Sequence, residues 1–307
     1  MRVTIVGSGF VGATTAMRVV QKGLAEVVLI DIVEGLPQGI ALDMRESAPV
    51  EAFEPTITGT NDYAETAGSD VVVITAGLPR QPGMSRMDLL EKNAGIVRDV
   101  VNDVKDGSPD AVLVVVTNPL DEMTFLAAET SGFPRERVMG MAGVLDSSRL
   151  RYFIAEELGV SPRSVEAMTL GSHGDAMVPL PRHARVEGKP LTELVDEATL
   201  ERLYQRTRDA GAEIVALLKK GSAYYAPSAS IAQMVNAIAG DTREVLPVCA
   251  WCTGQYGIDG VYVGVPAKLG GRGVEEIVQL DLSDQELSQL RAAAEGIRAK
   301  CEDLQKL

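Results

Sequence analysis

Short apolar runs alternate with amphipathic stretches along the first half of the chain. The apolar runs are continuous, without alternating polar positions, at residues 3–6, 27–30, 71–74 and 112–116. Residues 10–22 have the periodicity of an amphipathic helix and separate the first two runs. Strands that are apolar on both sides are typical of parallel sheets covered by helices on both faces. The pattern predicts an α/β fold with a doubly wound parallel sheet.

Beyond about residue 145 the pattern changes to mixed elements. A turn at residues 187–190, a helical stretch at residues 192–220 and alternating strand-like runs between residues 245 and 278 indicate an α+β lobe. A length of 307 residues is too great for one compact core and fits two packed lobes. We therefore expect two domains, residues 1–144 and residues 145–307.

The last stretch of the chain has the signature of a capped helix. Ser283 is followed three positions later by Glu286, which is the spacing of a capping box. Leu287, Leu290 and Ile297 then fall on one helical face. This spacing predicts a C-terminal helix that packs by that face.

A glycine-rich segment directly follows the first predicted strand and begins the first predicted helix. Gly7, Gly9 and Gly12 have GxGxxG spacing, which permits a tight turn, close approach to a pyrophosphate and close helix packing. Asp31 ends the second strand, 19 residues after Gly12, where a carboxylate accepts hydrogen bonds from both ribose hydroxyls and repels a 2′-phosphate. The combination predicts a Rossmann-type domain that binds NAD rather than NADP. A plain strand–turn–helix with a capping acid is the alternative.

One of the two histidines has a setting that suits acid–base chemistry. His173 lies in the glycine-flanked segment 171–175, after an apparent strand at residues 165–170. Oxidation of an alcohol needs a base for the hydroxyl proton, and histidine titrates near neutrality. Asp146 and Arg149 are three apart, hence on one helical face; the carboxylate could orient the imidazole and the guanidinium could bind a substrate carboxylate. A structural histidine and an ordinary surface ion pair are the alternatives.

Four separate segments together resemble the NAD-dependent malate and lactate dehydrogenase family. They are residues 7–12, residues 75–86, residues 117–120, and residues 146–149 with 171–175. In this order and spacing the resemblance runs almost the full length of the chain. It implies reversible hydride transfer between a 2-hydroxy acid and NAD.

The resemblance also implies a role for individual residues. His173 is similar to the family's proton donor and acceptor, Asp146 to its charge partner, and Arg149 to the clamp on the substrate's C1 carboxylate. Arg86 is similar to the arginine that polarises the reacting carbonyl, and Asn118 to the asparagine that bonds near the nicotinamide and the substrate oxygen. The cofactor-binding positions implied in this way are Gly7, Gly9, Phe10, Val11, Gly12, Asp31, Thr75, Ala76, Gly77, Asn93 and Asn118.

Arg80 distinguishes two substrates within the family. This position, six residues before Arg86, is typically arginine in malate dehydrogenases and glutamine in lactate dehydrogenases. Oxaloacetate has a second carboxylate, which arginine can neutralise bidentately when the segment from Leu78 to Met87 closes over the site. The resemblance therefore implies malate as substrate, with lactate or another 2-hydroxy acid as the alternative. Residues 141–145 and 174–179 resemble the lactate-dehydrogenase-like branch of malate dehydrogenases, which implies a homotetramer, with a dimer as the alternative.

The net charge indicates which partners are unfavourable, and the cysteines and the N-terminal pattern indicate the compartment. A formal charge of −14 disfavours nucleic acid and anionic membrane surfaces as partners. Three cysteines without framework spacing, together with a start that lacks a signal-peptide pattern, predict a cytoplasmic protein. The excess of acidic residues also suggests, as a hypothesis, adaptation to high salt.

Some residues look functional but fit a structural role better. Cys249 and Cys252 have redox-dithiol spacing, but they lie in a strand-like run where positions three apart face opposite sides, so we expect core packing. His183 has no paired acid and is expected in an exposed loop. No cluster has metal-ligand spacing, so no metal is expected. An NAD-sensing protein without turnover is the alternative of another class, and it would not need His173, Asp146 and the arginines together.

Overall fold

The computed structural model describes residues 1–54, 56–79 and 86–304, without the side chain of Arg86. Arg80 therefore lies outside the described residues. The helices are α1 Phe10–Gln21, α2 Leu36–Glu51, α3 Arg86–Lys105, α4 Leu120–Ser131, α5 Gly143–Leu158, α6 Glu197–Leu218, α7 Tyr225–Ala239 and α8 Asp284–Leu304. The strands are β1 Arg2–Val6, β2 Glu26–Ile30, β3 Ile57–Thr60, β4 Val71–Ile74, β5 Val112–Val115, β6 Val138–Gly140, β7 Val165–Glu166, β8 Thr169–Gly171, β9 Met177–Pro179, β10 Arg185–Val186, β11 Lys189–Pro190, β12 Glu244–Thr253, β13 Asp259–Gly270 and β14 Gly273–Ile277.

The predicted parallel sheet forms in the order β3-β2-β1-β4-β5-β6. Neighbouring strands in this part pair in parallel, as between Val3 and Val71. Alternate residues of one strand reach two different cores: Val71 and Val73 pack with α1, while Val72 and Ile74 pack with α3 and α4. Burial on both faces explains the continuous apolar runs, and the predicted α/β fold is confirmed.

The sheet does not stop where the pattern of the sequence changes. β6 pairs with β12 through Gly140 and Cys249, and the antiparallel strands β12, β13, β8 and β9, with β14 paired to β13, extend the sheet to eleven strands within the described residues. Cys249 and Cys252 are both buried and belong to different cores. The prediction that these two thiols pack on opposite faces is confirmed.

Two expected elements have different limits in the structure. The run at residues 165–170 is not one strand, because β7 pairs with β10 in a small three-stranded sheet whereas β8 pairs with β13 in the large one. The chain crosses between the sheets at residues 167–168. The helix expected from residue 192 begins later, at Glu197, because the Asp196 carboxylate accepts a hydrogen bond from the Thr199 amide at 2.8 Å and caps it.

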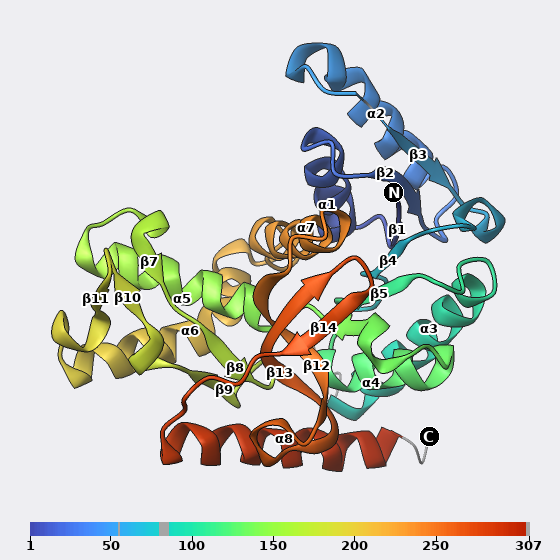
Figure 1. Ribbon diagram of the computed structural model, residues 1–307. Coiled ribbons are helices and arrows are strands. Elements are labelled where there is room, and N and C mark those ends of the chain that lie inside the picture. The colour runs from blue at the N-terminus through green and yellow to red at the C-terminus, as the bar shows by residue number, and fades with distance from the viewer. Residues whose placement is uncertain (55, 80–85, 305–307) are drawn as a thin grey trace.

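The C-terminal helix lies across the antiparallel end of the large sheet, as Figure 1 shows for α8 below β8, β9 and β13. Its capping box forms as predicted: Ser283 N–H donates to Glu286 at 2.7 Å, and Glu286 N–H donates to Ser283 Oγ at 3.2 Å. Leu290 and Ile297 are buried against the core. This helix therefore supports the strands that carry the residue 171–175 segment.

The junction between the two halves leaves no room for a side chain at Gly140, so we predict that Gly140→Ala destabilises the protein. A Cβ there would lie 2.5 Å from Thr124 Oγ1 and 3.0 Å from Cys249 Cβ. We expect a loss of about 1–3 kcal/mol in the free energy of unfolding, measured with urea. Gly39→Ala is the control, because nothing lies within 4 Å of its Cβ position on α2. Equal stability of the two variants would contradict this view of the junction.

Candidate active site

The glycine-rich turn leaves space for an anion at the start of α1. Gly7 has φ +103°, and a Cβ on Gly12 would lie 1.9 Å from the Gly7 carbonyl oxygen, so the turn and helix can meet this closely only with glycine. Gly9 caps α1 with its backbone alone, and no atom lies within 4 Å of its Cβ position. The free amides of the first helical turn face no acidic side chain of that turn. These residues fit a dinucleotide pyrophosphate.

Phe10 and Val11 begin α1 but face different surroundings. Val11 packs against the core, whereas Phe10 is 71% exposed and stacks on Tyr224 with ring centroids 5.1 Å apart. Tyr224 immediately precedes α7, which runs beside α1 (Figure 1). The stack connects the glycine-rich turn to the second half of the chain.

Asp31 connects the end of β2 to the glycine-rich turn. One carboxylate oxygen accepts the Ser8 amide at 2.6 Å, and the other accepts the Val33 amide at 3.0 Å. An ionised carboxylate has about four acceptor positions, so lone pairs remain for the hydroxyls of a ribose. Asp31 is half-buried, which leaves it accessible at this edge.

The ends of β4 and β5 form the next part of the same edge. Thr75 Oγ1 donates to the carbonyls of Val6 and Gly7 at 3.0 and 3.1 Å, and the Ala76 carbonyl accepts from Thr117 Oγ1 at 2.7 Å. A Cβ on Gly77 would lie 2.5 Å from a methyl group of Thr117. The close approach of these strand ends explains the glycine in the expected cofactor path.

Asn93 has a different setting from the other expected cofactor contacts. It is 1% exposed, its Oδ1 accepts the Leu78 amide at 2.8 Å, and its Nδ2 donates to the carbonyls of Leu78 and Asn118 at 3.1 and 2.7 Å. Both amide hydrogens are therefore used by the protein. Asn93 holds the backbone behind the exposed Asn118 rather than presenting a free amide.

His173, which is half-buried, pairs with the buried Asp146 between the loop after β8 and the first turn of α5. His173 Nδ1 lies 2.9 Å from Asp146 Oδ2, and the Asp146 side chain is 2% exposed. A carboxylate accepts, so Nδ1 carries the proton in this pair and Nε2 remains available for a ligand. Within the described residues, no hydrogen bond to Nε2 is found. The glycines around His173 include Gly171 and Gly174, both with positive φ.

The environment of His173 favours its protonated form. Burial lowers the pKa of His173, but the charge and the hydrogen bond of Asp146 outweigh burial, so the pKa lies above its ordinary value of 6.5. Asp146 is also in the first turn of α5, where the helix dipole stabilises a negative charge. The pair can therefore accept a proton and hold it near neutral pH.

Arg149 lies one helical turn after Asp146, on the same face as predicted. Its Nη1 is 3.6 Å from Asp146 Oδ1, and its side chain is 13% exposed, so this is not a surface ion pair. Burial lowers the pKa of Arg149, while Asp146 raises it. Its Nε is buried and has no hydrogen-bond partner within the described residues. A donor without a partner beside His173 fits a ligand carboxylate.

One charged residue at this site was not found from the sequence. Asp121, in the first turn of α4, is 2% exposed and accepts hydrogen bonds from Ser172 Oγ at 2.5 Å and the His173 amide at 3.2 Å. It comes directly after the motif at residues 117–120. The signal was an acidic residue beside that motif, but sequence alone could not show that α4 reaches the His173 loop.

Several other expectations concern the surroundings of the site. The segment 80–85 lies outside the described residues, and Arg86 is placed only as the first residue of α3. His183 is not in an exposed loop as expected: it is half-buried, and its Nε2 lies 3.0 Å from the Asp281 carbonyl oxygen.

The described part of the chain holds no cluster of three or more metal-ligating side chains. No described helix is long and apolar enough to cross a membrane.

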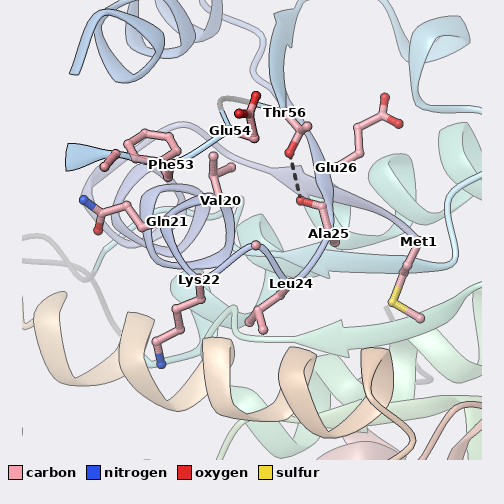
Figure 2. Close-up of a pocket in the computed structure, with 12 residues that line it drawn as sticks. Met1, Val20, Gln21, Lys22, Leu24, Ala25, Glu26, Phe53, Glu54 and Thr56 are labelled. Atoms are coloured by element: carbon pink, nitrogen blue, oxygen red, sulfur yellow. Dashed lines mark hydrogen bonds between the residues drawn. The ribbon is translucent and has the colours of Figure 1, made fainter. Parts of the chain in front are cut away.

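A hollow of about 640 Å³ lies at the other edge of the parallel sheet (Figure 2). It is lined by Met1, residues 20–26 and parts of the segment 52–56, which are next to the amino ends of β1, β2 and β3. Ligands of open α/β sheets bind at the carboxyl ends of the strands. The hollow is therefore separate from the edge that holds Gly7 and Asp31.

Comparison with known proteins agrees with this geometry. Residues 1–140 match the family model described as lactate/malate dehydrogenase, NAD binding domain, and residues 143–307 match lactate/malate dehydrogenase, alpha/beta C-terminal domain. Malate dehydrogenases of Salinibacter ruber and Nostoc punctiforme are each 54% identical over 100% of this chain, covering 98% and 94% of their own lengths.

Solved structures give the same result. The Salinibacter ruber malate dehydrogenase superposes with a TM-score of 0.96 at 51% identity, covering 100% of this chain and 98% of the other. A Cryptosporidium parvum lactate dehydrogenase complexed with lactic acid and nicotinamide adenine dinucleotide gives 0.96 at 40% identity, covering 100% and 98%. The chain belongs to the lactate/malate dehydrogenase family.

Proposed function

We propose that this protein is an NAD-dependent malate dehydrogenase, which interconverts (S)-malate and oxaloacetate. The observation that carries the proposal is the pairing of His173 with the buried Asp146, with Arg149 one turn away and its Nε without a partner among the described residues. This arrangement combines a proton acceptor with a carboxylate-binding group. The relatives that match the whole chain are named malate dehydrogenase, which supports malate as the substrate.

Each residue of the site has a separate role in the proposed reaction. When bound, NAD would supply the hydride acceptor for C2 of the hydroxy acid, and NADH the hydride donor for the oxo acid. His173 accepts the hydroxyl proton at Nε2, and Asp146 stabilises the resulting imidazolium. Arg149 binds the C1 carboxylate, and Asn118 and Arg86 act on the reacting oxygen. Arg80 neutralises the second carboxylate.

The cofactor fits the edge formed by Gly7, Gly9 and Asp31. The remaining contacts there come from Phe10, Val11 and Gly12 of the turn and from Thr75, Ala76, Gly77 and Asn118 at the neighbouring strand ends. Asn93 keeps residues 78 and 118 in place through the hydrogen bonds described above. The proposed roles thus separate groups that touch the cofactor from one that holds its surroundings.

The two directions of the reaction need opposite protonation states. Reduction of oxaloacetate requires protonated His173, so it is supported below the pKa of His173 and lost as the pH rises through it. Oxidation of malate requires the neutral imidazole and has the opposite dependence. Because Asp146 holds the pKa of His173 above 6.5, the form competent for reduction persists to higher pH than an ordinary histidine would allow.

We also propose the organisation and setting of the chain. Two domains meet at residues 144 and 145, and the family-model matches change within a few residues of that boundary, which supports the division. The protein is proposed to act in the cytoplasm, where its three buried free cysteines suit a reducing environment. A homotetramer is proposed, with a dimer as the alternative, and no nucleic acid or membrane partner.

We predict that Asp31→Ser changes the cofactor preference. Removing the carboxylate takes away both its ribose contacts and its repulsion of a 2′-phosphate, so the NAD-to-NADP ratio of kcat/KM should fall by about tenfold or more. Steady-state kinetics with each cofactor measure this ratio. Glu34→Ser is the control, since it removes an exposed acid three residues away. An unchanged ratio in Asp31→Ser would show that the ribose assignment is wrong.

The proposed substrate is tested by NADH oxidation with oxaloacetate and with pyruvate, at low and at molar salt. Wild type should strongly prefer oxaloacetate. In Arg80→Gln, kcat/KM for oxaloacetate should fall by about 100-fold, because a buried carboxylate loses its partner, while that for pyruvate should not fall. Arg182→Gln, which removes an exposed arginine paired with Asp281, should behave as wild type. Equal or pyruvate-favouring wild-type rates would instead indicate a lactate-type enzyme.

A further inference from the structure

The segment that carries His173 is held from two sides by carboxylates on different helices. Asp146 of α5 binds the imidazole Nδ1, and Asp121 of α4 accepts the hydrogen bonds of the Ser172 hydroxyl and the His173 main-chain amide. The ring and the main chain of the same residue therefore have separate partners. Asp146 has a proposed role in proton transfer, whereas Asp121 has had none.

Burial makes the charged form of the Asp121 carboxylate unfavourable. It is 2% exposed, and the titratable groups that face it are Glu122 on the same helix, His173, Cys249 of β12 and Cys301 of α8. Burial raises the pKa of Asp121, and the hydrogen bond from Ser172 lowers it. A hydrogen bond from Cys249 of β12 also lowers this pKa. The hydrogen bonds from Ser172 and from the His173 amide tie the carboxylate to the His173 segment.

Apart from Asp121, the His173 segment is held at its ends: the Gly174 carbonyl accepts the Met177 amide at 3.2 Å, and Gly171 pairs with Met177 of β9. Gly171 has φ +83° and Gly174 has φ +139°, and no atom lies within 4 Å of the Cβ position on Gly174. Before the segment, β8 pairs with β13 at Gly171 and Gly264. Between the two glycines, the described hydrogen bonds of the main chain and of Ser172 go to Asp121. The contact with Asp121 therefore fixes the position of the His173 main chain, from which the imidazole side chain extends.

The same helix connects the segment to the cofactor edge. α4 begins two residues after Asn118, whose carbonyl is held by Asn93, and Asp121 is in its first turn. A helix is stiff over one turn, so the distance between Asn118 and the His173 main chain is fixed by α4. Asn118 and His173 are proposed to act on the same substrate oxygen, one from each half of the chain.

We propose that Asp121 is a positioning residue, which holds the main chain of residues 172–173 through its acceptor oxygen and so aligns His173 with Asn118 at the substrate hydroxyl. This inference rests on the proposed function of His173 as proton acceptor. It predicts that an acceptor oxygen at position 121, rather than its charge, is required for turnover. NADH binding should not depend on it.

The test compares Asp121→Ala, Asp121→Asn and wild type. Asp121→Ala should lower kcat with oxaloacetate by roughly 10- to 100-fold, the effect of a misplacement of about 1 Å, and leave the Kd for NADH, measured by fluorescence, unchanged. Asp121→Asn keeps an acceptor oxygen and should retain kcat within about threefold of wild type. Glu286→Ala is the control: it removes another buried carboxylate that binds a main-chain amide, and it should leave kcat unchanged.

Histidine NMR gives a readout that does not need substrate. The chain has two histidines, so the titrations of His173 and His183 can be followed separately. The pKa of His173 should fall further in Asp121→Ala than in Asp121→Asn, because both variants lose a nearby carboxylate charge but only the alanine variant loosens the contact with Asp146; the pKa of His183 should not change in either. If Asp121→Ala fails to fold, Ser172→Ala serves instead, because it removes one of the two hydrogen bonds and should lower kcat by about threefold or more.

The outcomes are distinct. Wild-type kcat and an unchanged His173 titration in Asp121→Ala would overturn the inference, and so would an Asp121→Asn variant as slow as Asp121→Ala. Failure of wild type to reduce oxaloacetate would instead overturn the proposed function. The NMR titration would still judge the role of Asp121 in that case.

Discussion

The burial of the Asp146 carboxylate against the His173 imidazole is the constraint on which the rest of the site depends. A carboxylate that is 2% exposed is unfavourable unless charged or hydrogen-bonded groups compensate it. Here the compensation comes from His173 on a loop, from Arg149 on the next helical turn, and from the start of α5. These three partners hold one another in place, so the pair proposed for proton transfer and the arginine proposed to bind the substrate carboxylate form as a unit.

The continuous sheet makes this unit possible. The parallel part presents the cofactor edge at the carboxyl ends of β1, β2 and β4, and the pairing of β6 with β12 carries the sheet into the antiparallel strands. The pairing of β13 with β8 then places the His173 loop after an interior strand. The tight contacts at Gly140 and Gly264 show that these strands approach as closely as backbone atoms allow. A site shared by two halves of the chain thus rests on a single framework.

The net charge of −14 raises the question of how the chain binds a dianion and a pyrophosphate. Binding depends on the groups at the site itself, because salt screens the repulsion from distant charges but weakens contacts between desolvated groups much less. The amides at the start of α1 face no acidic side chain of the first turn, and Arg149 keeps a buried donor for a ligand. The distribution of charge at the site therefore matters more than the total.

Much of the fold could be predicted from the sequence because it depends on local patterns. The continuous apolar runs gave β1, β2, β4 and β5, the glycine spacing gave the turn before α1, and the Ser283 capping box gave α8. The division of residues 165–170 between two sheets could not be predicted, since both parts are apolar and only tertiary pairing separates them. Asp121 was missed for a similar reason, because its partners are 51 and 52 residues away. His183 likewise contacts the main chain of Asp281, 98 residues further along the chain.

The most direct test of the central claim is the pKa of His173, measured by histidine NMR in wild type and in Asp146→Asn. The account predicts a wild-type value above 6.5, a fall in Asp146→Asn because the charge and hydrogen bond of the carboxylate are weakened, and no change at His183. A wild-type value at or below 6.5, or one that does not change in Asp146→Asn, would contradict it. In that case the buried pair would not hold the proton that the proposed reaction needs.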